Sequence, residues 1–172
     1  METSRLHIRL ITDQDAPFLF ELMNTTGWYK NIGDRGIKTE KDALNYMRNK
    51  MHPDLKVKGF VNHVMIEKSS NKIVGTCSVH DREGVKGMDV GYALLPKFEG
   101  KGYATEGAKA MVNLAFDFYK QNQVSGITID ANPASCRVLE KLGFEAMGYI
   151  KLPQVDEQIK LYLLSQKEKN NE

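Results

Sequence analysis

Hydrophobic and polar positions along the chain change between a period of two and a period of about 3.6, which predicts an α+β (mixed α/β) fold. Near the N-terminus, Leu6, Ile8 and Leu10 alternate with polar residues and predict a first strand with one buried face. Two apolar runs joined by the polar turn EKSSNK predict an antiparallel hairpin. The predicted strands make a central sheet of six or seven strands, over residues 6–10, 60–66, 73–79, 88–95, 127–129, 144–150 and 159–164.

About four helices are predicted between these strands. Thr12 with Asp15, and again Thr39 with Asp42, resemble capping boxes that begin two of them. The longest helix starts near Gly102, since apolar residues recur at helical spacing from there to residue 119. The segment ANPAS introduces another helix, which runs through residue 142. The segment GWYKNIGDRG between the first two helices is expected to be a loop.

Length and composition fit one domain over residues 1–165, followed by a charged tail over residues 166–172. The 24 basic and 22 acidic residues give a net charge of +2, so neither a nucleic acid nor a membrane is expected as a partner. Two cysteines without a Cys-x-x-Cys motif, and no apolar signal segment, indicate a reduced, cytoplasmic protein. The four histidines show no metal-ligand spacing, so no metal is expected. A monomer and a homodimer both remain open.

Gly100 and Gly102 lie in a short loop between the strand that ends near residue 95 and the longest helix. Glycine lets the backbone approach an anion, and the first turn of a helix presents free N–H groups at its positive end. Lys97, Lys101 and Lys109 add positive charge nearby. A phosphate cradle is one interpretation of this pattern, and a solvated loop with ordinary lysines is the other.

Two other phosphate-binding motifs fit this loop less well. A dinucleotide-binding GxGxxG motif requires glycine at position 105, where the chain has Thr105. A P-loop requires Gly-Lys followed by Ser or Thr, and here Lys101 is followed by Gly102. The remaining hypothesis is a loop that holds a pyrophosphate on a helix N-terminus, with a second binding segment elsewhere in the chain.

Two segments in a fixed order carry a resemblance to a known family. The sequence VGYALLPKFEGKGYATEGA, followed later by NPASCRVLEKLGF, resembles the GCN5-related N-acetyltransferases (GNAT), and within them the ribosomal-protein N-terminal acetyltransferase (RimJ/RimL-like) branch. The resemblance runs over nearly the whole chain. It implies the GNAT fold, whose mixed, mostly antiparallel sheet splays between the fourth and fifth strands, and it implies acetyl-CoA (coenzyme A) as the acetyl donor.

The resemblance also implies which residues bind acetyl-CoA. The pantetheine arm would bond the backbone of Ala93, Leu94 and Leu95, and the pyrophosphate would sit on the N–H groups of Gly100, Lys101, Gly102, Tyr103, Ala104 and Thr105. Asn132 and Ser135 would reach the pantetheine arm and the thiol, and Arg137 and Lys141 would meet the nucleotide end. Helix capping or solvation is the alternative role of these last four residues. Glu99 departs from the family pattern, which usually has glutamine or arginine at this position.

Acetyl transfer to an amine requires a base for the amine and an acid for the departing thiolate. Asp89 stands where the branch commonly has a glutamate on the strand that leads to the acyl site, so the resemblance implies Asp89 as a base that acts through water. An exposed strand-end carboxylate is its alternative role, since a carboxyl group with a pKa of about 3.9 is a weak base. Ser135 and Tyr149 are the candidate acids.

The expected activity is direct acetyl transfer to a primary amine, with the α-amine of a protein or peptide N-terminus as the acceptor. An α-amine has a pKa of about 7.7 to 8.0, so it is neutral far more often at neutral pH than a lysine amine with a pKa of about 10.4. A small-molecule amine, such as an amino acid, a polyamine or an antibiotic, is the alternative acceptor. A non-catalytic acyl-CoA sensor and a nucleotide-binding regulator are alternative functions that the sequence leaves open.

Overall fold

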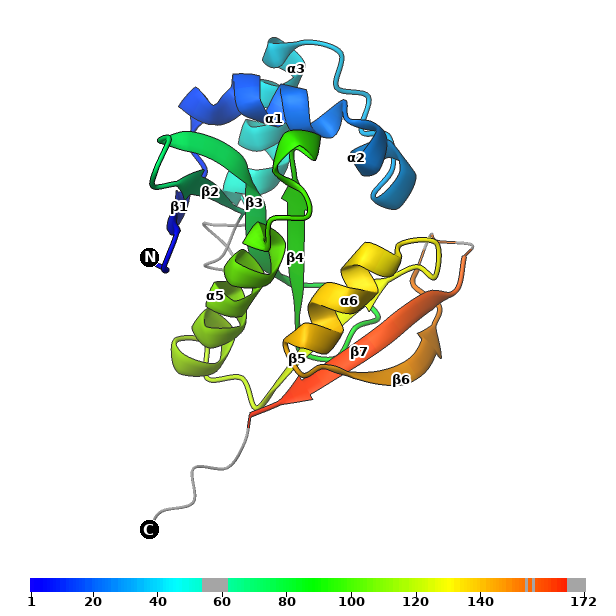
Figure 1. Cartoon of the computed structure of the whole chain (residues 1–172). Helices are drawn as coiled ribbons and strands as arrows, with labels where there is room; N and C mark the ends of the chain where they lie inside the picture. Colours follow the sequence, from blue (N-terminus) through cyan, green and yellow to red (C-terminus); the bar gives the residue numbers. More distant parts are fainter. Residues whose placement is uncertain (54–61, 154, 156, 167–172) are drawn as a thin grey trace.

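A sheet of seven strands, in the order β1-β2-β3-β4-β5-β7-β6, forms the centre of the computed structural model, which describes residues 1–53, 62–153, 155 and 157–166 (Figure 1). The neighbouring strands are antiparallel except β4 and β5, which run parallel. The strands are β1 (Leu6–Leu10), β2 (His63–Glu67), β3 (Lys72–Asp81), β4 (Met88–Leu94), β5 (Gln123–Thr128), β6 (Glu145–Ile150) and β7 (Ile159–Ser165). The predicted mixed, mostly antiparallel sheet is confirmed, including the β2–β3 hairpin. Residues 60 and 61 of one predicted strand, and the tail from residue 167, lie outside the described residues.

Five α-helices lie in the described part of the chain, one more than predicted. They are α1 (Ala16–Met23), α2 (Thr26–Asn31), α3 (Glu40–Tyr46), α5 (Tyr103–Asp117) and α6 (Pro133–Lys141). The short turns η1 (Asp13–Asp15), η2 (Met47–Met51) and η3 (Pro96–Phe98) adjoin helices or strand ends. Figure 1 shows α5 and α6 in front of the sheet, and α1 and α2 at the end of the sheet where β4 ends. Among the described residues, no helix has both the length and the apolar character needed to cross a membrane.

The two edge strands of the sheet, β1 and β6, are not regular strands with free backbone groups along their whole length. At the β1 edge, the chain before the strand folds back on it: the Met1 amino group donates to the Ile8 carbonyl (2.6 Å), and the Ile8 N–H donates to the Met1 carbonyl (2.8 Å). At the β6 edge, the register against β7 shifts between Ala146 and Gly148, and β6 is exposed over most of its length. Neither edge is therefore a regular, uncovered strand.

The predicted buried face of β1 is confirmed for two of its three residues. Leu6 and Ile8 are fully buried, whereas the prediction is wrong for Leu10, which is 42% exposed. Leu10 is the last residue of a strand at the edge of the sheet, so neighbouring elements cover it from fewer sides.

The segment GWYKNIGDRG, predicted as a loop after α1, begins inside α2 (Thr26–Asn31), so the prediction is wrong over residues 27–31. Thr25 caps this helix, because its Oγ1 accepts a hydrogen bond of 3.2 Å from the Trp28 N–H. Trp28 is only 9% exposed and anchors the short helix in the main core. The low helix propensity of Gly27 favours a loop in the local sequence pattern. Burial of the large Trp28 side chain outweighs this preference in the folded protein.

β5 begins at Gln123 rather than at the predicted residue 127. The apolar pattern misses the first half of the strand because that half contains polar residues. Ser125 is fully buried, and its hydroxyl donates to the Lys86 carbonyl at 3.0 Å. This hydrogen bond satisfies the hydroxyl, so a polar residue is tolerated inside a buried strand. The apolar pattern therefore predicts a strand shorter than the one that forms.

Both predicted capping boxes are present, but they begin different kinds of helix. Thr39 and Asp42 start α3 as predicted, since each backbone N–H donates to the other residue's side chain at 2.9 and 3.1 Å. Thr12 and Asp15 start the 3-10 turn η1, and α1 follows it. Asp15 is 3% exposed and also accepts two hydrogen bonds of 2.7 Å from Arg9. The first box therefore ties the end of β1 to α1.

β4 and β5 pair over three residues only, and the last pair is Val90 with Gly126. Beyond this pair, β4 continues to Leu94 and β5 to Thr128, but the two strands no longer pair with each other. Figure 1 shows them diverging. Gly126 also lets α6 approach β5 closely, since a Cβ at this position would lie 2.4 Å from the Leu139 side chain. The predicted splay between the fourth and fifth strands is confirmed, and it leaves one side of β4 without a strand neighbour.

α5 packs against β3 and β4 at a point of close approach on Gly107. A Cβ at Gly107 would lie 2.2 Å from Sδ of the fully buried Met65 and 3.5 Å from Cβ of Cys77. Ala108 and Met111 on the same helix are also fully buried. The position and tilt of α5, and with them the position of its N-terminus, therefore depend on a glycine at 107.

We predict that Gly107→Ala destabilises the protein, although alanine is normally favoured over glycine inside a helix by about 1 kcal/mol. The added methyl group overlaps Met65, and overpacking of this kind costs about 1–3 kcal/mol. Chemical denaturation measures the change in the free energy of unfolding. The second substitution Met65→Val should recover part of the loss, and a Gly107→Ala variant as stable as the wild type would contradict the close packing of α5.

Candidate active site

The opening between β4 and β5 is bordered by the four residues of β4 that follow Val90. No β5 residue in the described chain pairs with this segment, so its backbone groups on that side lack a strand partner. Such a segment can bind an extended ligand with amide groups as an added strand. Ala93 and Leu94, two of the predicted pantetheine contacts, lie in this segment. Leu95 lies just beyond it, and its N–H donates to the Val74 carbonyl at 3.0 Å.

The glycine loop joins this open segment of β4 to the start of α5. Gly100 (φ 72°) and Gly102 (φ 84°) have left-handed backbone conformations, and Gly102 is the N-cap of α5. A Cβ at Gly100 would meet no atom within 4 Å, so the space in front of the loop is open. The first turn of α5, at Tyr103, Ala104 and Thr105, adds N–H groups that have no partner within the helix. The loop therefore has the shape and the donors of an anion-binding site.

Arg5, the residue before β1, lies across this loop. Its guanidinium donates to the Lys101 carbonyl and to the Glu106 carboxylate, both at 2.8 Å, and stacks 4.6 Å from the centroid of the Tyr103 ring. Burial alone would raise the pKa of Glu106, but hydrogen bonds from Thr3 and Arg5 lower it below its ordinary value. The ion pair holds the loop in place, and the partly exposed Arg5 side chain adds positive charge beside it.

Glu99, which departs from the family pattern, is exposed at the start of the loop. A Cβ at Gly27 of α2 would lie 3.7 Å from its Oε1, so α2 lies beside the glycine loop. The next side chain back, Phe98, is buried, with Lys97 Nζ at 5.6 Å and Lys101 Nζ at 5.4 Å from its ring centroid. The two lysines therefore lie near the Phe98 ring, at the start of the glycine loop.

Asn132 and Ser135 lie at the start of α6, which faces β4 across the opening. The Asn132 side chain accepts the Ser135 N–H at 3.2 Å and so caps the helix. Ser135 Oγ lies 2.9 Å from the Tyr92 hydroxyl, which also donates to the Ser135 carbonyl at 3.2 Å. Burial raises the pKa of Tyr92 to about 12, so this hydroxyl keeps its proton at neutral pH. The two hydroxyls form a protonated pair that bridges β4 and α6.

The other predicted residues do not join this cluster. Arg137 and Lys141 are exposed on α6. Tyr149 is 51% exposed on the edge strand β6, which β5 and β7 separate from β4. Its hydroxyl donates to Asp130 at 2.7 Å, and this hydrogen bond raises the pKa of Tyr149. The structure therefore brings Ser135 to the opening and leaves Tyr149 at the far side of the sheet.

Asp89 lies in the paired part of β4, opposite His80 of β3 and Ser125 of β5. It is 1% exposed, and its two carboxylate oxygens accept hydrogen bonds of 3.1 and 3.2 Å from Arg82. The alternative interpretation of Asp89 as an exposed carboxylate is therefore wrong. Beside it, Ser78 Oγ lies 2.7 Å from Nε2 of His80. A serine, a histidine and an ion pair thus lie together near the start of the opening.

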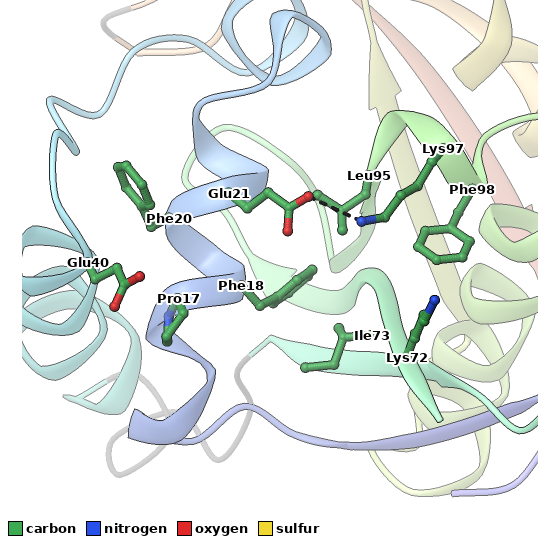
Figure 2. Close-up of a pocket in the computed structure, with 10 residues that line it drawn as sticks. All are labelled: Pro17, Phe18, Phe20, Glu21, Glu40, Lys72, Ile73, Leu95, Lys97 and Phe98. Atoms are coloured by element: carbon green, nitrogen blue, oxygen red, sulfur yellow. Dashed lines mark hydrogen bonds and ion pairs between the residues drawn. The ribbon is translucent and has the colours of Figure 1, made fainter. Parts of the chain in front are cut away.

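A separate cavity of about 540 Å³ lies between α1 and the segment after β4 (Figure 2). Phe18 and Phe98 line it, and Lys97 Nζ, 3.3 Å from Glu21 Oε1, joins the two sides. Of the predicted site residues, only Leu95 borders this cavity. It is therefore distinct from the opening between β4 and β5, where the predicted binding residues gather.

Tyr92 and Arg5 are site residues that the sequence patterns do not single out. Tyr92 carries a weak signal, because a tyrosine on a buried strand usually needs a hydrogen-bond partner for its hydroxyl. Arg5 carries none, because its partners Lys101 and Glu106 lie 96 and 101 positions away in the chain. Contacts of this kind become visible only when the strands and helices are assembled.

The splayed sheet, the open segment of β4 and the glycine loop on a helix N-terminus together define an acyl-CoA-dependent class of transferase fold. The family described as Acetyltransferase (GNAT) domain matches residues 5–145, which contain all three features. The chain belongs to this family of GNAT acetyltransferases, whose members use acetyl-CoA as the acetyl donor.

Similar proteins cover nearly the whole chain. The N-acetyltransferase YoaA of Bacillus subtilis is 23% identical over 152 residues, which are 88% of this chain and 85% of the relative. The crystal structure of a GNAT-family acetyltransferase from Bacillus anthracis has a TM-score of 0.79 at 27% identity, over 96% of this chain and 97% of that one. The ribosomal-protein-S5-alanine acetyltransferase from Vibrio fischeri shares the fold, with a TM-score of 0.80 at 21% identity over 98% and 97% of the two chains.

We predict that Gly100→Val lowers the affinity for coenzyme A by about tenfold or more, since the side chain fills the open space of the loop and disfavours its left-handed backbone. Titration calorimetry on the folded variant measures the dissociation constant. Gly36→Val is the matched control, because Gly36 (φ 69°) also has open space around it but lies outside the loop. Equal effects of the two substitutions would contradict a binding role for the loop.

Proposed function

We propose that this protein transfers the acetyl group of acetyl-CoA directly to a primary amine, and that this amine is the α-amine of a protein or peptide N-terminus. The observation that carries the proposal is the continuous path from the open segment of β4 into the glycine loop and the N-terminus of α5. Along this path, strand-like hydrogen-bonding groups are followed by an anion site. Acetyl-CoA has the same order of groups, since its amide-containing pantetheine arm leads to a pyrophosphate.

The residues along the path fit the acetyl donor. The backbone of Ala93 and Leu94 can pair with the pantetheine amides, and the N–H groups from Gly100 to Thr105 can bind the pyrophosphate. Arg5 and Lys101 add positive charge beside the loop. Asn132 and Ser135 face the same opening from α6, where the thioester end of the donor would lie.

The proposed reaction needs no covalent intermediate on the protein. The amine nitrogen forms a bond to the thioester carbonyl carbon, the carbon–sulfur bond breaks, and the sulfur leaves with the bonding electron pair. The amine nitrogen loses one proton to a base, and the thiolate gains one proton to become coenzyme A. The Tyr92–Ser135 hydroxyl pair suits the second step, because it can donate a hydrogen bond to the developing charge on sulfur and relay a proton to it.

The choice of an α-amine as acceptor rests on acid–base chemistry. At neutral pH about a tenth of an α-amine is uncharged, whereas a lysine amine is uncharged less than about one time in 10³. An attacking amine must be uncharged, so an α-amine requires much less help from the protein. The Vibrio fischeri protein with the same fold is named for an alanine of a ribosomal protein, which is consistent with this class of acceptor.

We predict that peptides with a free N-terminal alanine or serine are acetylated faster than blocked peptides that carry lysine, and faster than spermidine. The difference follows from the larger uncharged fraction of the α-amine. Release of the coenzyme A thiol and the mass of the peptide product measure the reaction. Faster reaction of the blocked lysine peptides or of spermidine would contradict the α-amine assignment and leave the acetyltransferase activity standing. No thiol release with any of these amines would contradict catalysis itself.

We predict that Tyr92→Phe lowers kcat by about tenfold or more and changes the affinity for coenzyme A by less than about threefold. The substitution removes the hydroxyl that lies 2.9 Å from Ser135 Oγ and keeps the aromatic ring. Steady-state kinetics and titration calorimetry separate the two effects. Tyr46→Phe is the control, because Tyr46 lies on α3, away from the opening. An unchanged kcat in Tyr92→Phe would remove the hydroxyl pair from the proposed mechanism.

A further inference from the structure

We propose that His80 accepts the proton of the acceptor amine, with the Ser78 hydroxyl as the relay between them. This inference rests on the acetyl transfer proposed above and assigns the base that the reaction needs. It is carried by the register of β3 on β4, which pairs Ser78 with Gly91 and His80 with Asp89. Side chains at these four positions point to one face of the sheet, because residues alternate along each strand.

The imidazole of His80 lies against the space above Gly91. A Cβ built at Gly91 would lie 3.2 Å from Nε2 and 3.3 Å from Cδ2 of His80, and 3.1 Å from Ser78 Oγ. Both polar atoms therefore border the place that a side chain at 91 would occupy. No Cβ at Gly91 covers the Ser78–His80 hydrogen bond of 2.7 Å. Ser78 is 4% exposed and His80 is partly exposed, so the acceptor amine would have to approach the pair from the side that Gly91 leaves bare.

Gly91 is also the residue at which the sheet opens. The last pair between β4 and β5 is Val90 with Gly126, so Gly91 is the first residue of β4 beside the opening. The imidazole therefore lies at the closed end of the opening. The Tyr92 side chain points to the opposite face, which it shares with Cys77, the residue that faces Gly107 of α5. The Ser78–His80 pair and the Tyr92 hydroxyl thus lie on opposite faces of the sheet, beside the neighbouring positions 91 and 92 of β4.

His80 is better suited to this proton than Asp89 for two reasons. Both carboxylate oxygens of Asp89 are already bonded to Arg82, and the residue lies in the paired part of β4 rather than beside the opening. Imidazole also has an ordinary pKa of about 6.5, about one unit below that of an α-amine, whereas a carboxyl pKa of about 3.9 lies about four units below it. Efficient general base catalysis favours the smaller difference.

In this arrangement, the Asp89–Arg82 ion pair beside the imidazole does not act as the base. Asp89 lies opposite His80 on β4, and Arg82, which follows β3, holds the carboxylate. A carboxylate next to an imidazole stabilises the imidazolium, and the neighbouring guanidinium reduces this effect. Asp89 and Arg82 are thus positioned to tune the base.

The proton path balances without a further reactant. An amine hydrogen passes to Ser78 Oγ as the serine hydroxyl hydrogen passes to Nε2 of His80, so the serine is unchanged and the imidazole becomes imidazolium. The nitrogen lone pair forms the bond to the carbonyl carbon, and the electrons of the broken carbon–sulfur bond leave on sulfur. The imidazolium then loses its proton to solvent, which restores His80 for the next turnover.

The test compares the wild-type protein with His80→Gln, whose amide can keep the hydrogen bond to Ser78 but cannot titrate. We expect kcat for an N-terminal peptide to fall about 10²-fold, with the dissociation constant of coenzyme A within about twofold of the wild type. The acidic limb of the kcat–pH profile should disappear. Asp89→Asn should keep this limb and move it to lower pH, because the imidazolium loses a stabilising charge. His52→Gln, on a histidine that lies near Asp13, is the matched control and should match the wild type.

Two further measurements keep the test decisive if His80→Gln folds poorly. Ser78→Ala, which breaks the relay and retains the histidine, should lower kcat about tenfold. In the wild-type protein, the NMR signals of the His80 ring should shift when an N-terminal peptide is added in the presence of coenzyme A, whereas those of His52 should not.

Each contrary outcome has one meaning. A kcat for His80→Gln within about threefold of the wild type, or an acidic limb that persists in it, overturns the assignment of His80. Loss of the limb in Asp89→Asn, with retention in His80→Gln, assigns the base to Asp89 instead. Thiol release by none of the proteins, including the wild type, overturns the proposed acetyl transfer together with this inference.

Discussion

The end of hydrogen bonding between β4 and β5 after Val90 and Gly126 is the constraint on which the rest of the site depends. Paired further, the two strands would satisfy each other's backbone groups and close the sheet. Instead, Gly126 lets α6 pack closely on β5, while Tyr92 bonds α6 from the side of β4. The backbone groups of the partly exposed open segment are left to solvent, or to a ligand that supplies amide groups.

The same opening divides the chemistry between the two faces of β4. A strand turns successive side chains to opposite faces, so neighbours in sequence such as Gly91 and Tyr92 serve different sides. Tyr92 contacts Ser135 of α6, and Gly91 lies against the Ser78–His80 pair of β3. In the proposed mechanism, the two proton transfers therefore take place on opposite sides of β4. Arg5, near the N-terminus, fixes the glycine loop by its hydrogen bonds to the Lys101 carbonyl and to Glu106.

Local patterns predict much of this fold, and long-range contacts account for most of what they miss. The capping box at Thr39 and Asp42 and the glycine loop before α5 are contained in a few consecutive residues, so the sequence predicts them. α2 is missed because burial of Trp28 decides it, and burial depends on the assembled core. The contact between His80 and the space above Gly91 depends on strand register, which the pattern of a single strand does not define.

The features at the two rims of the sheet bear on strand addition between copies of this protein. Extended chains add to any strand that presents free backbone groups, and a β-sheet protein with open rims tends to recruit its own copies. Here the first residues of the chain bond to Ile8 of β1, and the register shift next to Gly148 interrupts β6. Both rims therefore resist strand addition, whereas the interior side of β4 permits it. The molecule can accept an extended ligand by strand pairing inside its sheet and still discourage the same reaction between molecules at high concentration.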